Sequence, residues 1–368
     1  MESFQINCEE PDENFDFFEN PIEKIILKSK NKCEKIQKLF DFNKIPLSKE
    51  ENDYPLAYGI LAYKNVAQFL FMLSSFYQPQ NVYCVAYPQN SDEQFKKIIK
   101  ELKKCWNNVY FFERPKVEWG STEVINSVVF CLEFLTELSN EWKYFQYLSG
   151  VDIPIRTNLE MVKIFKAMKE APNFEITHYQ KERIMEKSFD DSPLPLWKSS
   201  LSSLIPRKTA KAIISSDISR NLLHFLDGTW IPDESFWATI LGNKKLFNIS
   251  GSLEANEFLS HQRSDTKVGY YISRYQSWDY SNCYGYFTQG SCVFGIHDLW
   301  HIRLSKHLVA HKFYLDYQPA AYFCLLKEHR HRSLNPLENF PIDFYSKLPQ
   351  VELINGITYD KLTHKDLI

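Results

Sequence analysis

Glycine is scarce in this chain of 368 residues, with only 11 copies. No glycine-rich phosphate loop and no GxSxG segment occurs, so P-loop enzymes and nucleophile-elbow hydrolases lose their best sequence markers. Asp-x-Asp, a pair that commonly holds a divalent ion against a nucleotide-sugar diphosphate, is absent as well. If the chain binds such a diphosphate, lysine or arginine must meet its charge instead.

Long apolar runs are also absent. No stretch of about 18 apolar residues occurs, so no segment is expected to span a membrane. The first 20 residues are acidic and lack the basic and apolar regions of a signal peptide. Taken alone, these absences suggest a cytosolic protein or an incomplete N-terminus.

The chain has little excess charge of either sign. Its formal net charge is −3, which gives a nucleic-acid partner no electrostatic support. Residues 96–104 are rich in lysine, but their apolar residues have helical spacing and indicate a solvated helix face. A cluster at 329–332 could suggest a metal site, yet its neighbours are basic and a helix C-terminus is favoured.

Eight cysteines are scattered along the chain, without a CxxC pair or a histidine at zinc-finger spacing, so a structural metal is not expected. An even number in this arrangement fits disulfides formed in an oxidising compartment. Eight reduced core cysteines would fit the count too. The only N-glycosylation sequon, Asn248-Ile249-Ser250, is a weak sign of the secretory route.

The first half of the chain alternates between two hydrophobic periods. Strands are predicted at 55–63, 82–87, 108–112 and 144–150, and helices at 65–77, 91–106, 121–140 and 157–169. This order predicts an α/β domain with a mainly parallel sheet. Ligands of such sheets bind past the carboxyl ends of the strands, which places Asp152 at the edge of a cleft.

The second half has weaker patterns. Residues 171–215 are irregular, a helix follows at about 216–226, and 250–296 read as loops and short strands. Two more helices are predicted at 298–313 and 319–331. Residues 1–55 and the tail after about 335 carry few structural signals.

One segment, IPDESFWATI at 231–240, puts a carboxylate beside much apolar surface. Pro232 suits the first turn of a helix and Gly242 its end, so Glu234 is predicted in the first turn of a short, buried helix. Two interpretations stay open on these residues alone. Glu234 either stabilises the helix through its dipole or acts as a catalytic base.

Several stretches together resemble the core-2/I-branching β-1,6-N-acetylglucosaminyltransferases, glycosyltransferase family 14, and their wording is most like that of nematode members. They cover most of residues 55–331 and are specific in combination. The stretches are YGILAYKNVAQFLFMLSSFYQPQNVYCVAY, EWKYFQYLSGVDIPIRTNLEMV, LWKSSLSSLIPR, IPDESFWATI, CVFGIHDL and HLVAHKF.

The resemblance implies a Rossmann-like nucleotide-sugar-binding domain of the glycosyltransferase A type at 55–335, with mainly parallel strands flanked by helices. A disulfide-tied arm at 1–54 and a tail of unclear structure at 336–368 would flank it. The implied reaction moves GlcNAc from UDP-GlcNAc to the 6-hydroxyl of an O-glycan or related acceptor, with inversion and without a cofactor or divalent metal.

The resemblance also implies a cellular setting. Members are type II Golgi membrane proteins, so the membrane anchor would lie outside this chain, which is a truncated form, an incomplete gene product or a soluble form. The implied disulfides are Cys8–Cys324, Cys33–Cys105, Cys84–Cys131 and Cys283–Cys292.

The resemblance also implies site residues by position, with a gap allowed for those on the acceptor side. Glu234 would be the base, with Asp233 as the capping residue. The donor would contact Lys312, Leu61, Trp119 and Asp152. Glu175 and Arg183 would contact the acceptor.

The chain also departs from the family pattern. Gln289 stands where an arginine should help neutralise the leaving diphosphate, and Arg303 or Lys306 is expected to substitute. Ala86-Tyr87-Pro88 replaces a family segment that has an aspartate near the nucleoside. Gln180 stands where the family has a lysine that contacts the acceptor, and Lys181 is adjacent. These departures motivate two alternatives: a catalytically silent lectin-like or scaffold protein, or transfer of a different sugar.

Overall fold

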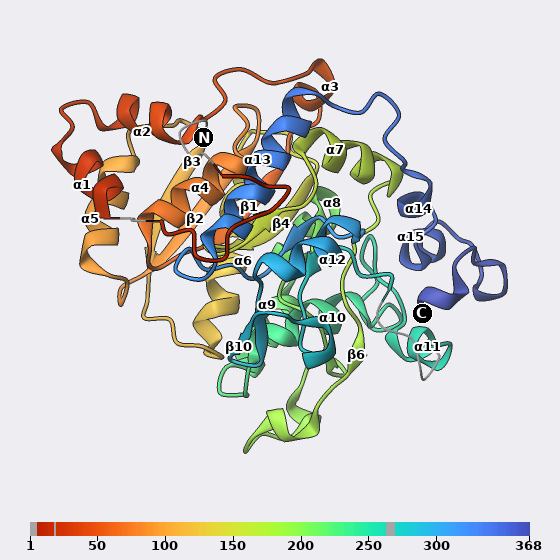
Figure 1. Ribbon diagram of the computed structural model, residues 1–368. Coiled ribbons are helices and arrows are strands. Elements are labelled where there is room, and N and C mark those ends of the chain that lie inside the picture. The colour runs from red at the N-terminus through yellow and green to blue at the C-terminus, as the bar shows by residue number, and fades with distance from the viewer. Residues whose placement is uncertain (1–5, 18–19, 263–268) are drawn as a thin grey trace.

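A computed structural model describes residues 6–17, 20–262 and 269–368. At its centre is a five-stranded sheet in the order β3-β2-β1-β4-β8, wrapped by helices (Figure 1). The first four strands of this order are parallel and β8 is antiparallel to β4. The bounds are β1 (Ala57–Leu61), β2 (Val82–Pro88), β3 (Val109–Arg114), β4 (Tyr144–Ser149) and β8 (Leu204–Pro206).

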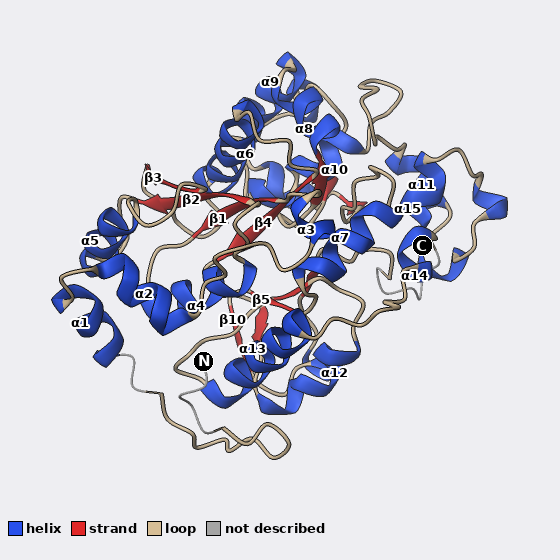
Figure 2. Ribbon diagram, turned by 90° about the horizontal axis from the view of Figure 1, so that it is seen from above, coloured by secondary structure: helices blue, strands red, loops and turns tan. Residues whose placement is uncertain are grey.

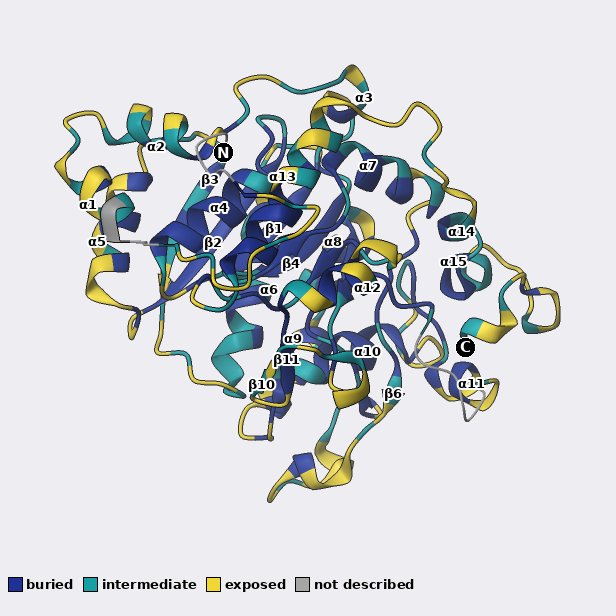
Figure 3. Cartoon of the chain, viewed as in Figure 1, coloured by how far each residue is buried: buried dark blue, intermediate teal, exposed yellow. Residues whose placement is uncertain are grey.

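Strand β2 shows why this sheet is central. All seven of its residues are buried, as expected of a parallel strand covered on both faces. Alternate side chains enter opposite cores: Tyr83 and Val85 enter one, Cys84 and Ala86 the other. The sheet therefore separates two hydrophobic cores. Figure 3 shows that the central strands are buried.

Helices cover both faces of the sheet (Figure 2). Apolar side chains of one set enter the same core as Tyr83. This set is α2 (Lys32–Phe40), α4 (Val66–Phe76), α5 (Glu93–Leu102), α7 (Asn158–Ala167) and α13 (Pro319–Leu334). The other core is filled from α6 (Thr122–Glu137), α8 (Arg207–Ile214), α9 (Asp217–Leu226), α10 (Phe236–Leu241) and α11 (Ala255–Ser260).

Three smaller sheets lie beside the central one. The sheet β5-β12-β9 combines β5 (Ile153–Pro154), β12 (Val309–Ala310) and β9 (Arg274–Tyr275). Two antiparallel pairs join β6 (Thr177–His178) to β7 (Trp197–Lys198), and β10 (Tyr286–Thr288) to β11 (Ser291–Val293). They carry side chains from distant parts of the chain to the carboxyl edge of the central sheet.

The predicted alternation of strands and helices from 55 to 169 is confirmed, as are the helices near 216–226 and 319–331. Thr157 and Glu160 form a capping box at the start of α7, where the predicted helix begins. The helix predicted at 298–313 is wrong beyond α12 (Leu299–Leu304). Residues 309–310 instead pair with two strands, so tertiary pairing overrides the local helical pattern.

Three regions without clear patterns also hold structure. The irregular stretch 171–215 contains α8 and short strands. The arm contains α1 (Asn20–Lys28), α2 and α3 (Lys49–Asn52). The tail forms α14 (Asp343–Ser346) and α15 (Pro349–Ile354), and its Tyr345, Leu348 and Val351 are buried in the core. How the chain divides into domains stays a prediction.

All four implied disulfides are present: Cys8–Cys324, Cys33–Cys105, Cys84–Cys131 and Cys283–Cys292. This settles the choice left open by the cysteine count. Within the described residues, no helix combines the length and apolar character needed to cross a membrane.

Candidate active site

Two adjoining cavities open at the carboxyl edge of the central sheet. The first, the strand-end cavity, has a volume of about 440 Å³ and is lined by Leu61, Pro88 and Ser149, the last residues of three parallel strands. The second, the carboxylate cavity, has a volume of about 570 Å³ and is lined by Glu175 and Glu234 among others. The cavities share lining residues, which are Trp119, Val124, Tyr147, Gln276, Trp278, Gln289 and His311.

Glu234 enters the carboxylate cavity from a different local structure than predicted. It is the last residue of a 3₁₀ turn, η3 (Pro232–Glu234), and α10 begins two residues later. Asp233 is not a cap: no side chain caps α10, and Asp233 Oδ1 is buried without a hydrogen-bond partner. Because all six residues of α10 are buried, the helix anchors Glu234 from behind.

Two cations hold one oxygen of the Glu234 carboxylate. Arg183 Nη2 lies 2.8 Å and Lys198 Nζ 3.6 Å from Oε2. The side chain is 19% exposed, so it is fixed by its partners and still reaches the cavity. This arrangement orients the carboxylate of Glu234 in the cavity.

Two further carboxyl groups line the same cavity. Burial raises the pKa of Glu175, and the Glu234 charge adds to that rise while Lys198 opposes it. Burial, followed by the Glu234 charge, raises the pKa of Asp233 to about 7. Crowding of like charges in a poorly hydrated site disfavours simultaneous ionisation. At neutral pH the cavity therefore favours a protonated or partly protonated Asp233 beside Glu234.

The walls of the carboxylate cavity combine unsatisfied donors with aromatic surface. Arg183, in η1 (Lys181–Ile184), is buried, and its Nε and Nη1 have no protein hydrogen-bond partner. Its guanidinium lies 5.9 Å from the Trp230 ring centroid. Trp119, Trp230 and Trp278 line the cavities and are each roughly half exposed. Such a wall suits a polar ligand with apolar faces.

Lys312 is a buried cation in the strand-end cavity. It is 5% exposed, and its Nζ donates to the Thr288 carbonyl at 3.0 Å. No carboxylate of the described residues forms an ion pair with it. Burial, and then the charge of Lys64, lowers its pKa to about 8. A buried ammonium without an acidic partner marks a place for an anion.

Lys64 is the second cation of this cavity. It follows β1 by three residues, and its Nζ lies 5.5 Å from the centroid of the Tyr314 ring. Lys312 Nζ lies 5.9 Å from the same centroid. Two ammonium groups therefore border one aromatic ring in the strand-end cavity.

The expected substitutes for the family arginine do not reach either cavity. Arg303 forms an ion pair with Glu328, and Lys306 lies over the Phe344 ring. That expectation is wrong, because both residues lie outside the lining of the two cavities. Gln289 does line both. It forms a two-residue hairpin turn with Gly290, with both φ angles positive as a type I′ turn requires.

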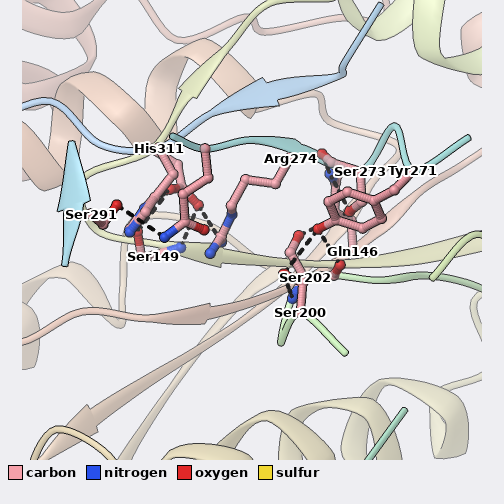
Figure 4. A network of polar contacts seen from close by, with 11 residues as sticks. Gln146, Ser149, Ser200, Ser202, Tyr271, Ser273, Arg274, Ser291 and His311 are labelled. Atoms are coloured by element: carbon pink, nitrogen blue, oxygen red, sulfur yellow. Dashed lines mark hydrogen bonds and ion pairs between the residues drawn. The ribbon is translucent and has the colours of Figure 1, made fainter. Parts of the chain in front are cut away.

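Asp152 lies behind the cavities rather than at their edge. It is fully buried, and its Oδ2 accepts hydrogen bonds from Arg274 Nη2 at 2.8 Å and from the Ser149 backbone N–H at 2.7 Å. Its Oδ1 lies 2.7 Å from Nδ1 of His311 (Figure 4). Arg274 and His311 line the carboxylate cavity whereas Asp152 lines neither. Asp152 therefore acts by holding these two side chains.

The structure thus sorts the predicted site residues. Glu175, Arg183 and Glu234 meet in one cavity, and Leu61, Trp119 and Lys312 line the other. Gln180, which stands at the position of the acceptor lysine, lines the carboxylate cavity, whereas the adjacent Lys181 does not. The sequon residue Asn248 is exposed in a loop between α10 and α11.

Sequence reasoning missed several residues that line the cavities: Lys64, Lys198, Trp230, Arg274 and His311. Lys64 had a usable signal, because it closely follows a predicted strand whose carboxyl end faces the cleft. Lys198 occupies the short strand β7, in a stretch without periodicity, and only folding brings it to Glu234.

Comparisons with known proteins agree with this geometry. The family model for the Core-2/I-Branching enzyme matches residues 56–303. The human beta-1,3-galactosyl-O-glycosyl-glycoprotein beta-1,6-N-acetylglucosaminyltransferase is 28% identical over 325 residues, covering 80% of this chain and 74% of that protein. Mouse beta-1,3-galactosyl-O-glycosyl-glycoprotein beta-1,6-N-acetylglucosaminyltransferase 3 is 28% identical over 331 residues, covering 82% and 74%.

Among solved structures, mouse xyloside xylosyltransferase 1 in its apo form matches with 14% identity and a TM-score of 0.28, over 53% of this chain and 84% of that chain. A likeness this weak carries no argument. The particular likeness to nematode members stays a prediction. The family match spans most of the chain, so the protein belongs to the Core-2/I-Branching family of glycosyltransferases.

Proposed function

We propose that the protein is an inverting, metal-independent transferase that moves GlcNAc from UDP-GlcNAc to the 6-hydroxyl of a galactosyl O-glycan or a related acceptor. One observation carries the proposal. A fixed carboxylate, Glu234, faces one cavity, and the adjoining cavity holds two ammonium groups, Lys64 and Lys312, that form no ion pair with a described carboxylate. This is the charge distribution of a displacement between a hydroxyl nucleophile and a diphosphate leaving group.

The proposed step is a single displacement. Glu234 takes the proton of the acceptor hydroxyl as its oxygen bonds to the anomeric carbon. The bond from that carbon to the UDP oxygen breaks, and the electron pair leaves on the diphosphate. One base on the attacking side and cations on the leaving side favour inversion, because the nucleophile enters opposite the leaving group.

Lys312 and Lys64 would stabilise the charge that develops on the diphosphate. An arginine is not needed for this if two lysines reach the phosphates, since each is a compact positive charge. A diphosphate between them would also relieve their mutual repulsion, which is part of the cause of the low pKa of Lys312. The Lys312 pKa should rise when the donor binds.

The lining residues also support a metal-free site. In the described part of the chain, Glu118 is the one carboxylate that lines the strand-end cavity, and it pairs with Lys116. Among all described residues, the one group with the spacing of metal ligands consists of Cys283, Cys292 and Asp298. Both of its sulfurs belong to a disulfide. Turnover should therefore survive EDTA, and abolition by EDTA would contradict metal independence.

The acceptor would occupy the carboxylate cavity. The human and mouse relatives are named for a β-1,3-galactosyl-O-glycosyl-glycoprotein. A sugar offers the hydroxyls that the unsatisfied donors of Arg183 and the carboxylate of Glu175 could bind. The exposed face of Trp230 could pack on the sugar ring. Oxygen-rich, partly apolar ligands fit such walls.

The decisive experiment is Glu234→Gln. We expect turnover of UDP-GlcNAc with an aryl galactosyl-β-1,3-GalNAc acceptor to fall by about 10²–10⁴-fold, because the amide cannot take the proton. UDP affinity, measured by calorimetry, should hardly change. Glu182→Gln, at an exposed position beside Arg183, is the matched control and should keep full activity. Turnover near the wild-type rate in Glu234→Gln would exclude Glu234 as the base.

The neutral side chain of Gln289 favours a second candidate, a catalytically silent, sugar-binding member of the family. It predicts glycan binding without release of UDP from any UDP-sugar. Detecting UDP release across a panel of UDP-sugars separates the two functions, and it also tests transfer of a different sugar.

We further propose that the protein works in the Golgi lumen. The four disulfides support an oxidising compartment, and Asn248 is exposed and so accessible to glycosylation. A shift in mass upon Asn248→Gln in protein secreted from animal cells would support this route. Free thiols in freshly isolated protein would contradict it.

A further inference from the structure

His311 lies where the two cavities meet and lines both of them. This inference rests on the proposed function. There, the anomeric carbon is bonded to a diphosphate in the strand-end cavity and is attacked by a hydroxyl in the carboxylate cavity. The transferred sugar must therefore span the junction. His311 is placed to touch that sugar rather than the nucleotide or the acceptor.

The imidazole of His311 is held in one orientation (Figure 4). Its Nδ1 lies 2.7 Å from Asp152 Oδ1 and 3.2 Å from Ser149 Oγ. Asp152 is itself fixed by Arg274 and by the backbone and hydroxyl of Ser149. An ionised carboxylate only accepts hydrogen bonds, so Nδ1 must carry the hydrogen. The other ring nitrogen, Nε2, is then an acceptor, and no described residue bonds to it.

The charges around His311 keep it neutral. Its side chain is 15% exposed, and burial together with the positive charge of Arg274 lowers its pKa to about 4. Asp152 opposes this shift and Lys312 adds to it. The other polar side chains that line both cavities, Tyr147, Gln276 and Gln289, are uncharged, as is the neighbouring Ser149. At neutral pH the junction therefore contains a fixed imidazole that can accept but not donate through Nε2.

We propose that His311 is a specificity-determining residue that accepts, through Nε2, a hydrogen bond from a hydroxyl or amide N–H of the transferred sugar. Two amides also line both cavities: Gln276, whose Nε2 donates to Ser291 Oγ at 3.0 Å, and Gln289 of the hairpin turn. A sugar that presents a hydrogen-bond donor to the fixed acceptor of His311 should bind more tightly than a sugar that does not.

The test compares UDP with UDP-GlcNAc on the full, disulfide-bonded chain. In His311→Phe we expect the calorimetric affinity for UDP-GlcNAc to fall about tenfold, as for the loss of one hydrogen bond in a closed site. The affinity for UDP should stay within about twofold. His311→Gln, which keeps an acceptor, should recover part of the loss. Circular dichroism and melting of both variants establish that they are folded.

A second measurement does not depend on activity. Nitrogen-15 NMR of histidine-labelled wild type should show His311 neutral with the hydrogen on Nδ1. Asp152→Asn would let the new amide donate to Nδ1 and move the hydrogen to Nε2, so UDP-GlcNAc affinity should fall while the imidazole remains.

Each result decides between alternatives. Equal losses of UDP and UDP-GlcNAc affinity in His311→Phe, no loss at all, or a hydrogen on Nε2 in the wild type would overturn the sugar-reading role. If the wild type turns over the donor and only the sugar-specific loss is absent, this inference fails and the proposed function stands. If the wild type binds no UDP-sugar, both fail.

Discussion

Lys64 and Lys312 lie close enough to influence each other across the Tyr314 ring, and no carboxylate in the described part of the chain pairs with either. Burying one ammonium near another costs stability in the empty protein, so the pair is an arrangement suited to an anion. The low pKa of Lys312, caused first by burial and then by the charge of Lys64, reflects this cost. It also provides a way to test whether both lysines serve the donor.

We predict that Lys64→Gln lowers turnover by about tenfold to a hundredfold, because one charge is removed from the leaving group. It should also raise the pKa of Lys312 above its value of about 8, since a like charge that lowers it is gone. Lys312 binds the diphosphate when protonated, so UDP affinity falls as the pH rises through its pKa. That fall should shift to higher pH in the variant, as followed by calorimetry from pH 6 to 10.

Lys306→Gln is the matched control, because Lys306 lies over Phe344 and lines neither cavity. Its turnover and pH midpoint should equal those of the wild type. If Lys64→Gln also leaves both quantities unchanged, Lys64 does not contribute to the donor site and Lys312 acts alone.

For single residues, sequence motifs predicted which side chains reach the cavities better than they predicted the contacts of those side chains. Glu234 and Lys312 stand in recognisable stretches and reach the expected cavities. Asp152 was expected at the cleft edge, yet it is buried beneath His311. Lys198 and Lys64 lie in matching stretches but were not predicted as site residues, because their positions beside Glu234 and Lys312 arise from pairings between distant segments. A motif can therefore identify a functional side chain, but its contacts depend on how distant segments fold together.

The short element η3 shows how a single turn sets the protonation of a site. It places Asp233 and Glu234 side by side, where burial and the neighbouring charge raise the pKa of Asp233 to about 7. A carboxyl with a raised pKa stabilises the fold below its ordinary pKa of 3.8. That contribution is lost as the pH rises through about 7, because the folded protein must give up a proton that it binds more tightly than the unfolded chain does.

We therefore predict that Asp233→Asn stabilises the protein more at pH 8 than at pH 4, with a difference on the order of 1–2 kcal/mol after allowance for partial solvent access. Urea unfolding at the two pH values measures the difference. Asp190→Asn, at an exposed position, is the control and should show little pH dependence. An equal effect of Asp233→Asn at both pH values would contradict the raised pKa.

Elements with strong periodicity were predictable, and elements made by pairing were not. The capping box of α7 and the helical face of α4 are local patterns, and both elements form as expected. Strand β12 has two residues and lies in a stretch that looks helical. It is a strand because β5 and β9 lie on either side of it. Two-residue strands are decided by partners that no local window contains.

At the scale of the whole molecule, the α/β class followed from the alternation of strands and helices, but the helical content of the arm and the tail did not. Both regions are polar along much of their length. Their few apolar residues form no local pattern, and their role in packing is evident only from the core that they cover. Tyr345 of the tail is buried there, and Phe17 of the arm packs on Phe71 and Phe323.

The Cys8–Cys324 disulfide links this arm to α13 across a sequence separation of 316 residues, whereas Cys283–Cys292 spans only 9. In the chain-entropy account, a disulfide stabilises by restricting the unfolded chain, and the restriction grows with the logarithm of loop length. The two separations predict that the long bridge contributes about 3 kcal/mol more than the short one.

We therefore predict that Cys8→Ser with Cys324→Ser lowers the free energy of unfolding by more than Cys283→Ser with Cys292→Ser does, as measured by urea unfolding of matched preparations. Donor turnover at 25 °C should survive loss of the long bridge, because neither of its cysteines lines a cavity. Equal losses of stability would mean that strain or residual structure in the unfolded chain outweighs loop entropy. Loss of turnover in a still-folded Cys8/Cys324 variant would instead show that the arm positions the strand-end cavity through α13.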